Sequence, residues 1–139
     1  MAYHFLEHTA DEKFAAEGKT LEETFSFAAQ AFKEAVCGKI TVLEQETKPV
    51  EIKGDNLENL LYKFLEEFIF LLDSEDFLFS QVKDLKIDKE KFILTANITG
   101  DKGENYKFTN DVKAVTYNEM FVKFNKEKNI WECQAVLDV

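Results

Sequence analysis

The sequence predicts an α+β fold in which two amphipathic helices pack on a largely antiparallel or mixed sheet, in a single domain covering residues 1–139. Apolar residues recur at three- and four-residue steps in two segments of the first half, which is the period of a helix. In the second half they recur at every second position, which is the period of a strand. The one proline and five glycines are scattered, without a linker-like stretch or a repeat period, so no domain boundary is expected.

The first helix is expected to begin after Thr20 and to end at Gly38. The Thr20 hydroxyl can cap the helix, while Glu23, at the third helical position, can reach back to the backbone amide of the cap. Before this helix, residues 3–7 and 13–17 are predicted to form two short strands. One buried stripe of the helix is predicted from Leu21, Phe25, Ala28, Ala29, Phe32 and Val36.

The second helix is expected to follow a strand at residues 50–53 and to be capped by Asp55 or Asn56. The acidic run 73–76 closes it at the end where the helix dipole disfavours negative charge. This run predicts a turn, and the alternative is an electronegative docking edge. The wide apolar face of the helix comprises Leu57, Leu60, Leu61, Phe64, Leu65, Phe68, Ile69 and Leu72.

Alternating apolar residues predict five strands after residue 76, at 82–87, 92–98, 112–117, 121–124 and 130–136. The first two form a hairpin joined near residues 88–91, and the last two form another around the charged turn 125–129. Residues 100–111 are polar and contain glycine, so a mobile loop is expected there. Because the helices lie early and most strands lie late, both helices are expected to cover one sheet.

The formal net charge is −10, and all 17 basic residues are lysine. A protein that binds nucleic acid directly needs a basic stripe to neutralise phosphates, and arginine suits that role best. The composition therefore argues against direct nucleic-acid binding and suits a basic protein partner or a divalent cation. No glycine-rich phosphate-binding motif is present, so any nucleotide involved is expected to be bound by another protein.

The two cysteines, Cys37 and Cys133, are far apart and lack the spacing of a zinc site, so free, buried thiols are expected. The first residues show no basic cluster followed by an apolar stretch, and no run of about 18 apolar residues occurs. We therefore expect neither a signal peptide nor a membrane span, and we expect a cytoplasmic protein.

Two acidic residues stand at predicted strand ends. Asp11 lies between the first two strands, and Asp138 lies just past the last. If these ends meet, Asp11, Asp138 and the free carboxylate or carbonyl of Val139 would offer only oxygen ligands, which suit calcium, magnesium or manganese and suit zinc poorly. The spacing alone does not require this convergence, and the alternative is that both are solvated acids.

His8 stands beside Asp11, which suggests a catalytic pair, but no nucleophile or zinc-protease motif accompanies it, so a hydrolase is not supported. A hydrogen-bonded structural role near a strand end is the simpler interpretation of His8. Lys113 stands on a predicted strand, where a lysine is ordinarily a solvated surface residue.

Several blocks of the sequence resemble the archease family. They occur in the family's order along nearly the whole chain, and their combination is more specific than any one of them. The first begins with His-Thr-Ala-Asp, and the last ends with Leu-Asp-Val. The similar segments are 8–11, 18–23, 60–67, 70–75, 112–117 with Met120, and 136–139.

Archeases are small α+β proteins that act with the RtcB-type RNA ligase, which joins tRNA exon halves using GTP and manganese. The resemblance implies a non-catalytic activator in tRNA splicing and RNA repair, which promotes guanylylation of the ligase's active-site histidine and permits multiple turnover. It implies that Asp11, Asp138 and Val139 bind a divalent metal ion, expected to be calcium, with magnesium or manganese as alternatives. Lys113 matches a position important for ligase activation. His8 would contact the metal ligands without binding the metal itself.

Asn118 departs from the family pattern, which commonly has histidine after a Thr-Tyr or Thr-Phe pair. Asparagine can donate and accept hydrogen bonds but cannot carry a proton near neutral pH, so the resemblance does not carry an acid–base or metal role to this position. A different class of function is a metal-binding chaperone or general interaction module that acts on several partners through its acidic face.

Overall fold

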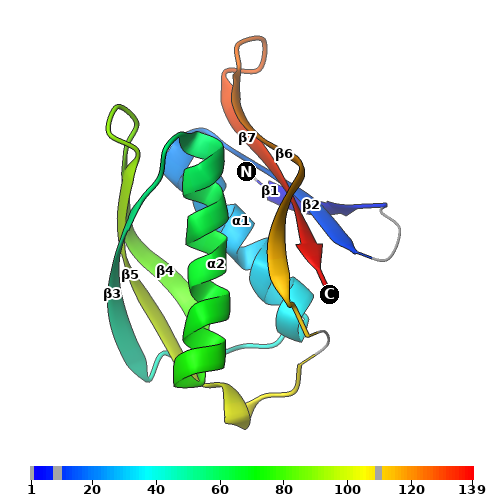
Figure 1. Ribbon diagram of the computed structural model, residues 1–139, viewed down its shortest axis with the longest axis vertical. Helices are drawn as coiled ribbons and strands as arrows, with labels where there is room; N and C mark the ends of the chain where they lie inside the picture. The colour runs from blue at the N-terminus through cyan, green and yellow to red at the C-terminus, as the bar shows by residue number, and fades with distance from the viewer. Residues whose placement is uncertain (1, 8–10, 109–110) are drawn as a thin grey trace.

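The computed structural model shows two antiparallel sheets with two long helices between them (Figure 1). It describes residues 2–7, 11–108 and 111–139. The helices are α1 (Leu21–Cys37) and α2 (Leu57–Glu75), and a short 3-10 helix, η1, spans Gly103–Asn105. The four-stranded sheet has the order β1 (Ala2–Leu6), β2 (Glu12–Gly18), β7 (Ile130–Asp138) and β6 (Ala114–Asn125). The three-stranded sheet has the order β3 (Glu46–Lys53), β5 (Ile93–Lys102) and β4 (Phe77–Asp88).

The α+β class and both helices are confirmed, but the strands form two sheets where we expected both helices to cover one. The reason is the burial of α1, which extends beyond a single stripe to Thr24, Ala31 and Ala35. A helix buried on two sides can join two sheets. Accordingly, α1 packs against β2 of one sheet and β4 of the other, and α2 packs against β6 and β4. A search of the described residues finds no helix with the length and hydropathy of a membrane span.

The core between the sheets is aromatic. Phe68 of α2 stacks on Phe79 of β4 with 4.1 Å between ring centroids, and it lies 5.7 Å from Phe32 of α1. Phe25 of α1 and Phe64 of α2 stack at 5.9 Å. All five side chains are buried. Replacing such a ring by alanine typically costs about 3–5 kcal/mol, so these contacts hold the helices to each other and to β4.

Capping explains where α1 begins and ends. The Thr20 hydroxyl accepts a hydrogen bond from the backbone N–H of Glu23 at 3.0 Å, as predicted. The Glu23 carboxylate accepts from the N–H of Lys19 at 3.3 Å, where the amide of Thr20 was expected. After Cys37, Gly38 adopts a φ of 70°, which glycine reaches without strain.

Asn56, one of the two predicted caps, begins α2, because its side chain accepts from the N–H of Asn59 at 2.8 Å. The acidic run after α2 forms the predicted turn, and Asp76 has a left-handed φ of 51°. The Asp76 carbonyl accepts from the N–H of Gly103 at 2.8 Å, and its carboxylate accepts from the N–H of Glu104 at 3.4 Å. This carboxylate therefore stands at the start of η1, where negative charge is favourable.

The first part of segment 100–111 is not the loop that we predicted, because β5 runs on to Lys102 and η1 follows. Asp101 is 7% exposed and accepts hydrogen bonds from the Tyr106 hydroxyl and the Lys102 N–H, both at 2.8 Å. These bonds hold the pKa of Asp101 below its usual value. The Tyr106 hydroxyl in turn accepts from the N–H of Leu43 at 2.9 Å, which ties this segment to the chain before β3.

The structure contains an internal repeat that the sequence did not reveal. In each sheet, one strand leads into a helix and pairs with the second strand of a later hairpin, so β2, β7 and β6 correspond to β3, β5 and β4. In both copies, a glycine at the junction of the leading strand and its helix lies so close to the helix backbone that a side chain has no room there. A Cβ atom on Gly18 would lie 2.8 Å from the backbone nitrogen of Thr24, and one on Gly54 would lie 2.7 Å from that of Leu60.

The helix in each copy of the repeat also binds an edge strand in the sheet of the other copy. Glu22, the second residue of α1, accepts from the N–H of Ile87 in β4 at 3.2 Å. Glu58, the second residue of α2, accepts from the N–H of Val122 in β6 at 3.0 Å. Both β4 and β6 are edge strands, whose unpaired N–H groups invite association with other chains. The two glutamates therefore cover two edges in the same way.

Candidate functional site

The predicted ligands meet at one end of the four-stranded sheet. Glu12 of β2 lies opposite Leu137 of β7, and Asp11 and Asp138 each follow one residue further toward the same end. Figure 1 shows the C-terminus at this end, near the start of β6. The structure therefore brings Asp11, Asp138 and Val139 together from the two ends of the sequence.

The backbone at this end is fixed by β7, which lies between β2 and β6. Asp138 lies opposite Ala114, and its carbonyl oxygen accepts a hydrogen bond from the N–H of Lys113 at 2.8 Å. Asp11, Asp138 and Val139 are half-buried, so each keeps some exposed surface at this end of the sheet. The residues of β7 without exposed surface are Cys133, Ala135, Val136 and Leu137.

Lys113 directly precedes β6 at the same end, and it is exposed. Asn118 lies further along, in the bulge between Thr116 and Phe121, where its N–H donates to the Thr116 hydroxyl at 3.3 Å. His8 lies outside the described residues, so its support of the site stays a prediction.

The donors that Asp11, Asp138 and Val139 offer are all oxygen atoms. Among the described residues, no three side chains of histidine, cysteine, aspartate or glutamate are grouped so that they could hold a metal ion. A cation here would therefore rely on the carboxylates of Asp11 and Asp138, on the backbone oxygens of Val139 and on water. Magnesium in particular retains several waters and binds through one or two carboxylates. These oxygen donors suit such a hard cation and suit zinc poorly.

The two thiols lie in the core. Cys37 and Cys133 are free and buried, as predicted. Burial raises the pKa of Cys37 and raises that of Cys133 to about 12. Both thiols are therefore protonated near neutral pH and unreactive in the metal-free protein.

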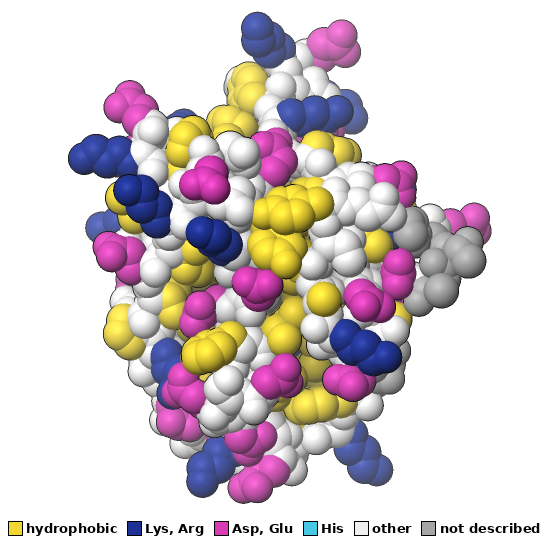
Figure 2. Space-filling model, viewed as in Figure 1, with side chains coloured by type: hydrophobic (Ala, Val, Ile, Leu, Met, Phe, Trp, Pro, Cys, Tyr) yellow, Lys and Arg dark blue, Asp and Glu magenta, His cyan; other side chains and the backbone are white. Residues whose placement is uncertain are grey.

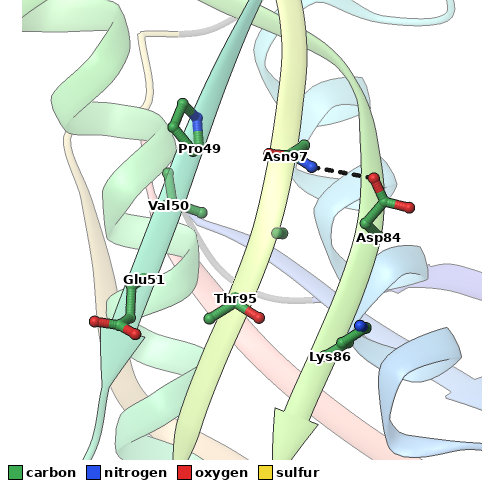
Figure 3. Close-up of a pocket in the computed structure, with 8 residues that line it drawn as sticks. Pro49, Val50, Glu51, Asp84, Lys86, Thr95 and Asn97 are labelled. Carbon is green, nitrogen blue, oxygen red and sulfur yellow. Dashed lines mark hydrogen bonds between the residues drawn. The ribbon is translucent and has the colours of Figure 1, made fainter.

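A wide, open hollow of about 440 Å³ lies on the outer face of the three-stranded sheet (Figure 3). Pro49 and Glu51 of β3, Asn97 of β5, and Asp84 and Lys86 of β4 contribute to its lining. The Asn97 side chain donates to the Asp84 carboxylate at 3.0 Å. Figure 3 shows these side chains spread over three strands without a common centre, so the hollow presents no catalytic or metal-binding arrangement.

The face formed by α2 and β6 shows hydrophobic side chains among acidic and basic ones (Figure 2). Tyr117 of the β6 bulge is 52% exposed and stacks on Tyr62 of α2, with 4.3 Å between centroids and 7° between ring planes. Its hydroxyl accepts from the side-chain amide of Asn59 at 2.6 Å. The sequence did not predict this contact, because the bulge that turns Tyr117 toward α2 has no signal in the alternation of β6.

Comparisons with known proteins find matches that cover nearly the whole chain. The sequence pattern of the Archease protein family (MTH1598/TM1083) matches residues 3–139. Protein archease of Methanosarcina mazei is 33% identical over 141 residues, covering 99% of this chain and 95% of the relative. Protein archease of Pyrobaculum neutrophilum is 36% identical over 141 residues, with 99% and 95% covered.

A solved structure agrees with the fold. The solution structure of Methanobacterium thermoautotrophicum protein 1598 matches with a TM-score of 0.83 and 33% sequence identity, covering 99% of each chain. The match therefore includes both sheets, both helices and the strand ends that carry Asp11 and Asp138. On sequence and on structure, this chain belongs to the archease family.

Proposed function

We propose that this protein is a non-catalytic activator of an RtcB-type, GTP-dependent RNA ligase in tRNA splicing and RNA repair. It promotes guanylylation of the ligase and permits multiple turnover through a divalent metal site. The observation that supports this most is the meeting of Asp11, Asp138 and Val139 at one end of the four-stranded sheet. Membership of the archease family supports the same assignment.

The proposed ligands are the carboxylates of Asp11 and Asp138 and the backbone oxygens of Val139. A bound divalent ion would supply positive charge that screens the triphosphate oxygens in the ligase's nucleotide pocket. The protein's own contribution is to keep the ligands in a fixed register, because β7 is held by two neighbouring strands and the Asp138 carbonyl by Lys113 at 2.8 Å. Ligands that are already ordered lose less entropy on binding. We expect calcium, with magnesium or manganese as alternatives.

Lys113 supplies a positive charge at the same end of the sheet. Lys113 is exposed, and we expect its ammonium group to contact a phosphate or a carboxylate of the ligase complex. The net charge of −10 favours docking on a basic surface, such as the one a ligase needs for RNA. Because this chain has no arginine, the RNA is assigned to the ligase.

The decisive test is a ligation assay with the cognate ligase, GTP, manganese and an excess of RNA, run with and without this protein. We expect ligated RNA to exceed the amount of ligase only when the protein is present. Equal yields in the two reactions would reject the proposed function.

Variants then test the site. Asp11→Ala, Asp138→Ala and Lys113→Ala should each abolish most of the stimulation without changing the thermal unfolding midpoint. Glu90→Ala, in the turn between β4 and β5 of the other sheet, is the matched control and should stimulate like the wild type. Calorimetric titration with calcium and manganese should show binding that the two aspartate variants lose. Stimulation that survives either aspartate substitution argues against the site.

The alternative function, a metal-binding chaperone or general interaction module, is favoured by exposed apolar side chains such as Leu43 and Phe70, which are 54% and 52% exposed. Affinity capture from cell extract separates the two functions. One dominant RNA-ligase partner supports the activator, and a broad set of partners supports the interaction module.

A further inference from the structure

A pocket of about 260 Å³ lies where α1 and α2 end and the chain approaches β6. Phe108, 44% exposed, stands at its rim. Pockets that enclose a small-molecule ligand usually measure about 300–1,000 Å³, so this one suits a single side chain better than a cofactor. Its inner wall is apolar and mostly buried, and it is formed by Phe32, Val36, Ile69, Leu72 and Val112.

The mouth of this pocket is negative. Three exposed aspartates line it, Asp73, Asp76 and Asp111. Among the described residues, no lysine forms an ion pair with any of the three. Two long helices also end here, and neither carries a basic residue in its last turn. The C-terminus of a helix carries partial negative charge. The negative potentials of the carboxylates and of the two helix ends therefore add at the mouth of the pocket.

Apolar walls below a negative mouth match a side chain with an aliphatic stem and a cationic head. We propose that this pocket binds an arginine or lysine side chain of a partner protein. The aliphatic stem lies against the apolar wall, and the cation is bound by Asp73, Asp76 or Asp111. Arginine fits best, because its planar guanidinium donates paired hydrogen bonds to carboxylates. A neutral apolar anchor leaves the carboxylates unpaired, and a phosphate is repelled.

The pocket adjoins the candidate metal site. Asp111 and Val112 line the pocket and directly precede Lys113, whose N–H donates to the Asp138 carbonyl at 2.8 Å. A partner anchored in the pocket would therefore lie at the end of the sheet where Asp11 and Asp138 meet. Naming the RNA ligase as that partner rests on the proposed function, whereas binding of a basic side chain does not.

A direct test uses the isolated protein and a minimal probe, N-acetyl-arginine amide, followed by NMR of the methyl groups. We expect saturable shifts at the methyls of Val36, Ile69 and Val112. N-acetyl-citrulline amide has nearly the same shape but no charge, and it should bind about tenfold more weakly. Absence of shifts at these methyls, or equal shifts with the two probes, overturns the proposal.

Charge-reversal variants connect the pocket to the ligase. Asp73→Lys and Asp111→Lys should lose the arginine-specific shifts and weaken ligase binding about tenfold. Glu90→Lys changes the net charge by the same amount outside the pocket and should behave like the wild type. Asp73→Lys places a cation at the C-terminus of α2, which favours the fold, so unfolding is not expected to cause the loss.

The outcomes separate the two proposals. If the wild type stimulates the ligase but Asp73→Lys and Asp111→Lys bind arginine amide and the ligase as Glu90→Lys does, the pocket proposal is wrong and the activator function stands. If arginine amide binds as expected but the wild type neither binds nor stimulates the ligase, the pocket stands and the proposed function fails.

Discussion

The two sheets share one framework but differ at one end. Counting back seven residues from the glycine at or after the end of β2 and of β3 gives Asp11 in one sheet and Thr47 in the other. Thr47 lies opposite Thr99 of β5, whereas Asp11 has Asp138 at the same end of the neighbouring strand. The repeat therefore places two carboxylates where its other copy has two hydroxyl groups.

The threonine end is also closed by the protein's own chain. The Thr99 hydroxyl donates to the Glu44 carboxylate at 2.7 Å, and Glu44 pairs with Lys83 at 2.9 Å. The N–H of Gln45 donates to the carbonyl of Gly100 at 2.9 Å. The aspartate end instead faces solvent in part and carries Lys113 nearby. The comparison teaches that the fold supplies two equivalent paired strand ends and that residue identity makes the aspartate end the candidate site.

The largest effect on ligase stimulation is expected from substitutions of the two aspartates at the candidate site. Asp11→Asn and Asp138→Asn keep the shape of the side chains but remove the charge that a divalent cation requires, so ligase stimulation should be lost. Thr47→Ala and Thr99→Ala, at the equivalent positions, should leave stimulation unchanged in the same turnover assay. Loss of stimulation in the threonine variants as well would mean that the two ends are not functionally different.

The next effect tests whether the repeat is structurally equivalent. Gly18→Ala and Gly54→Ala each place a Cβ atom within 3.0 Å of helix backbone, and each should destabilise the fold by about 1–3 kcal/mol. Denaturant unfolding of the two variants measures this. A destabilisation confined to one glycine would show that the two strand-to-helix junctions are not equivalent.

A smaller effect is expected at the edges. Glu22→Ala and Glu58→Ala each remove a charged acceptor from an edge N–H, at a cost of about 1–2 kcal/mol. Amide hydrogen exchange should accelerate at Ile87 in the first variant and at Val122 in the second. Unchanged exchange at both amides would show that the glutamates do not protect the edges in solution.

The smallest effect concerns the closed end. Lys83 and the Thr99 hydroxyl hold the pKa of Glu44 below its usual value, and Lys83 is the larger cause. A lowered folded-state pKa contributes stability above the unfolded pKa, and this is lost as the pH falls through the folded value. Lys83→Met should raise the Glu44 pKa in an NMR titration, and its stability deficit should shrink as the carboxylate becomes protonated. A Glu44 pKa that does not move would exclude this ion pair as the cause.

Local features of the fold were predictable from the sequence because their signals are local. The hydroxyl of Thr20 and the side chain of Asn56 mark the starts of both helices, and apolar spacing marks their buried faces. The division into two sheets was not predictable, because pairing of β2 with β7 joins segments from opposite ends of the chain. The internal repeat was not predictable from the sequence, because its two copies share little beyond a glycine and a helix that starts with Leu-Glu.

For the candidate site, the sequence supplied the residue types but not their register. Strand ends carrying Asp11 and Asp138 suggested that these residues could meet, and only the pairing of Glu12 with Leu137 brings them to the same end. The side-chain pocket at Asp73 and Asp111 gave a weaker signal. Part of it appeared as the acidic run after α2, but its apolar wall comes from segments distant in sequence.

Each helix binds an edge strand of the other repeat copy, and this has a consequence for folding. Each sheet has one edge strand with a backbone N–H bound by a helix of the other copy, through Glu22 on β4 and Glu58 on β6. A fragment limited to residues 46–102 would therefore keep three strands but lose the helix that protects β4. Neither half is a self-sufficient folding unit, and we expect the chain to unfold in one cooperative transition and its fragments to aggregate.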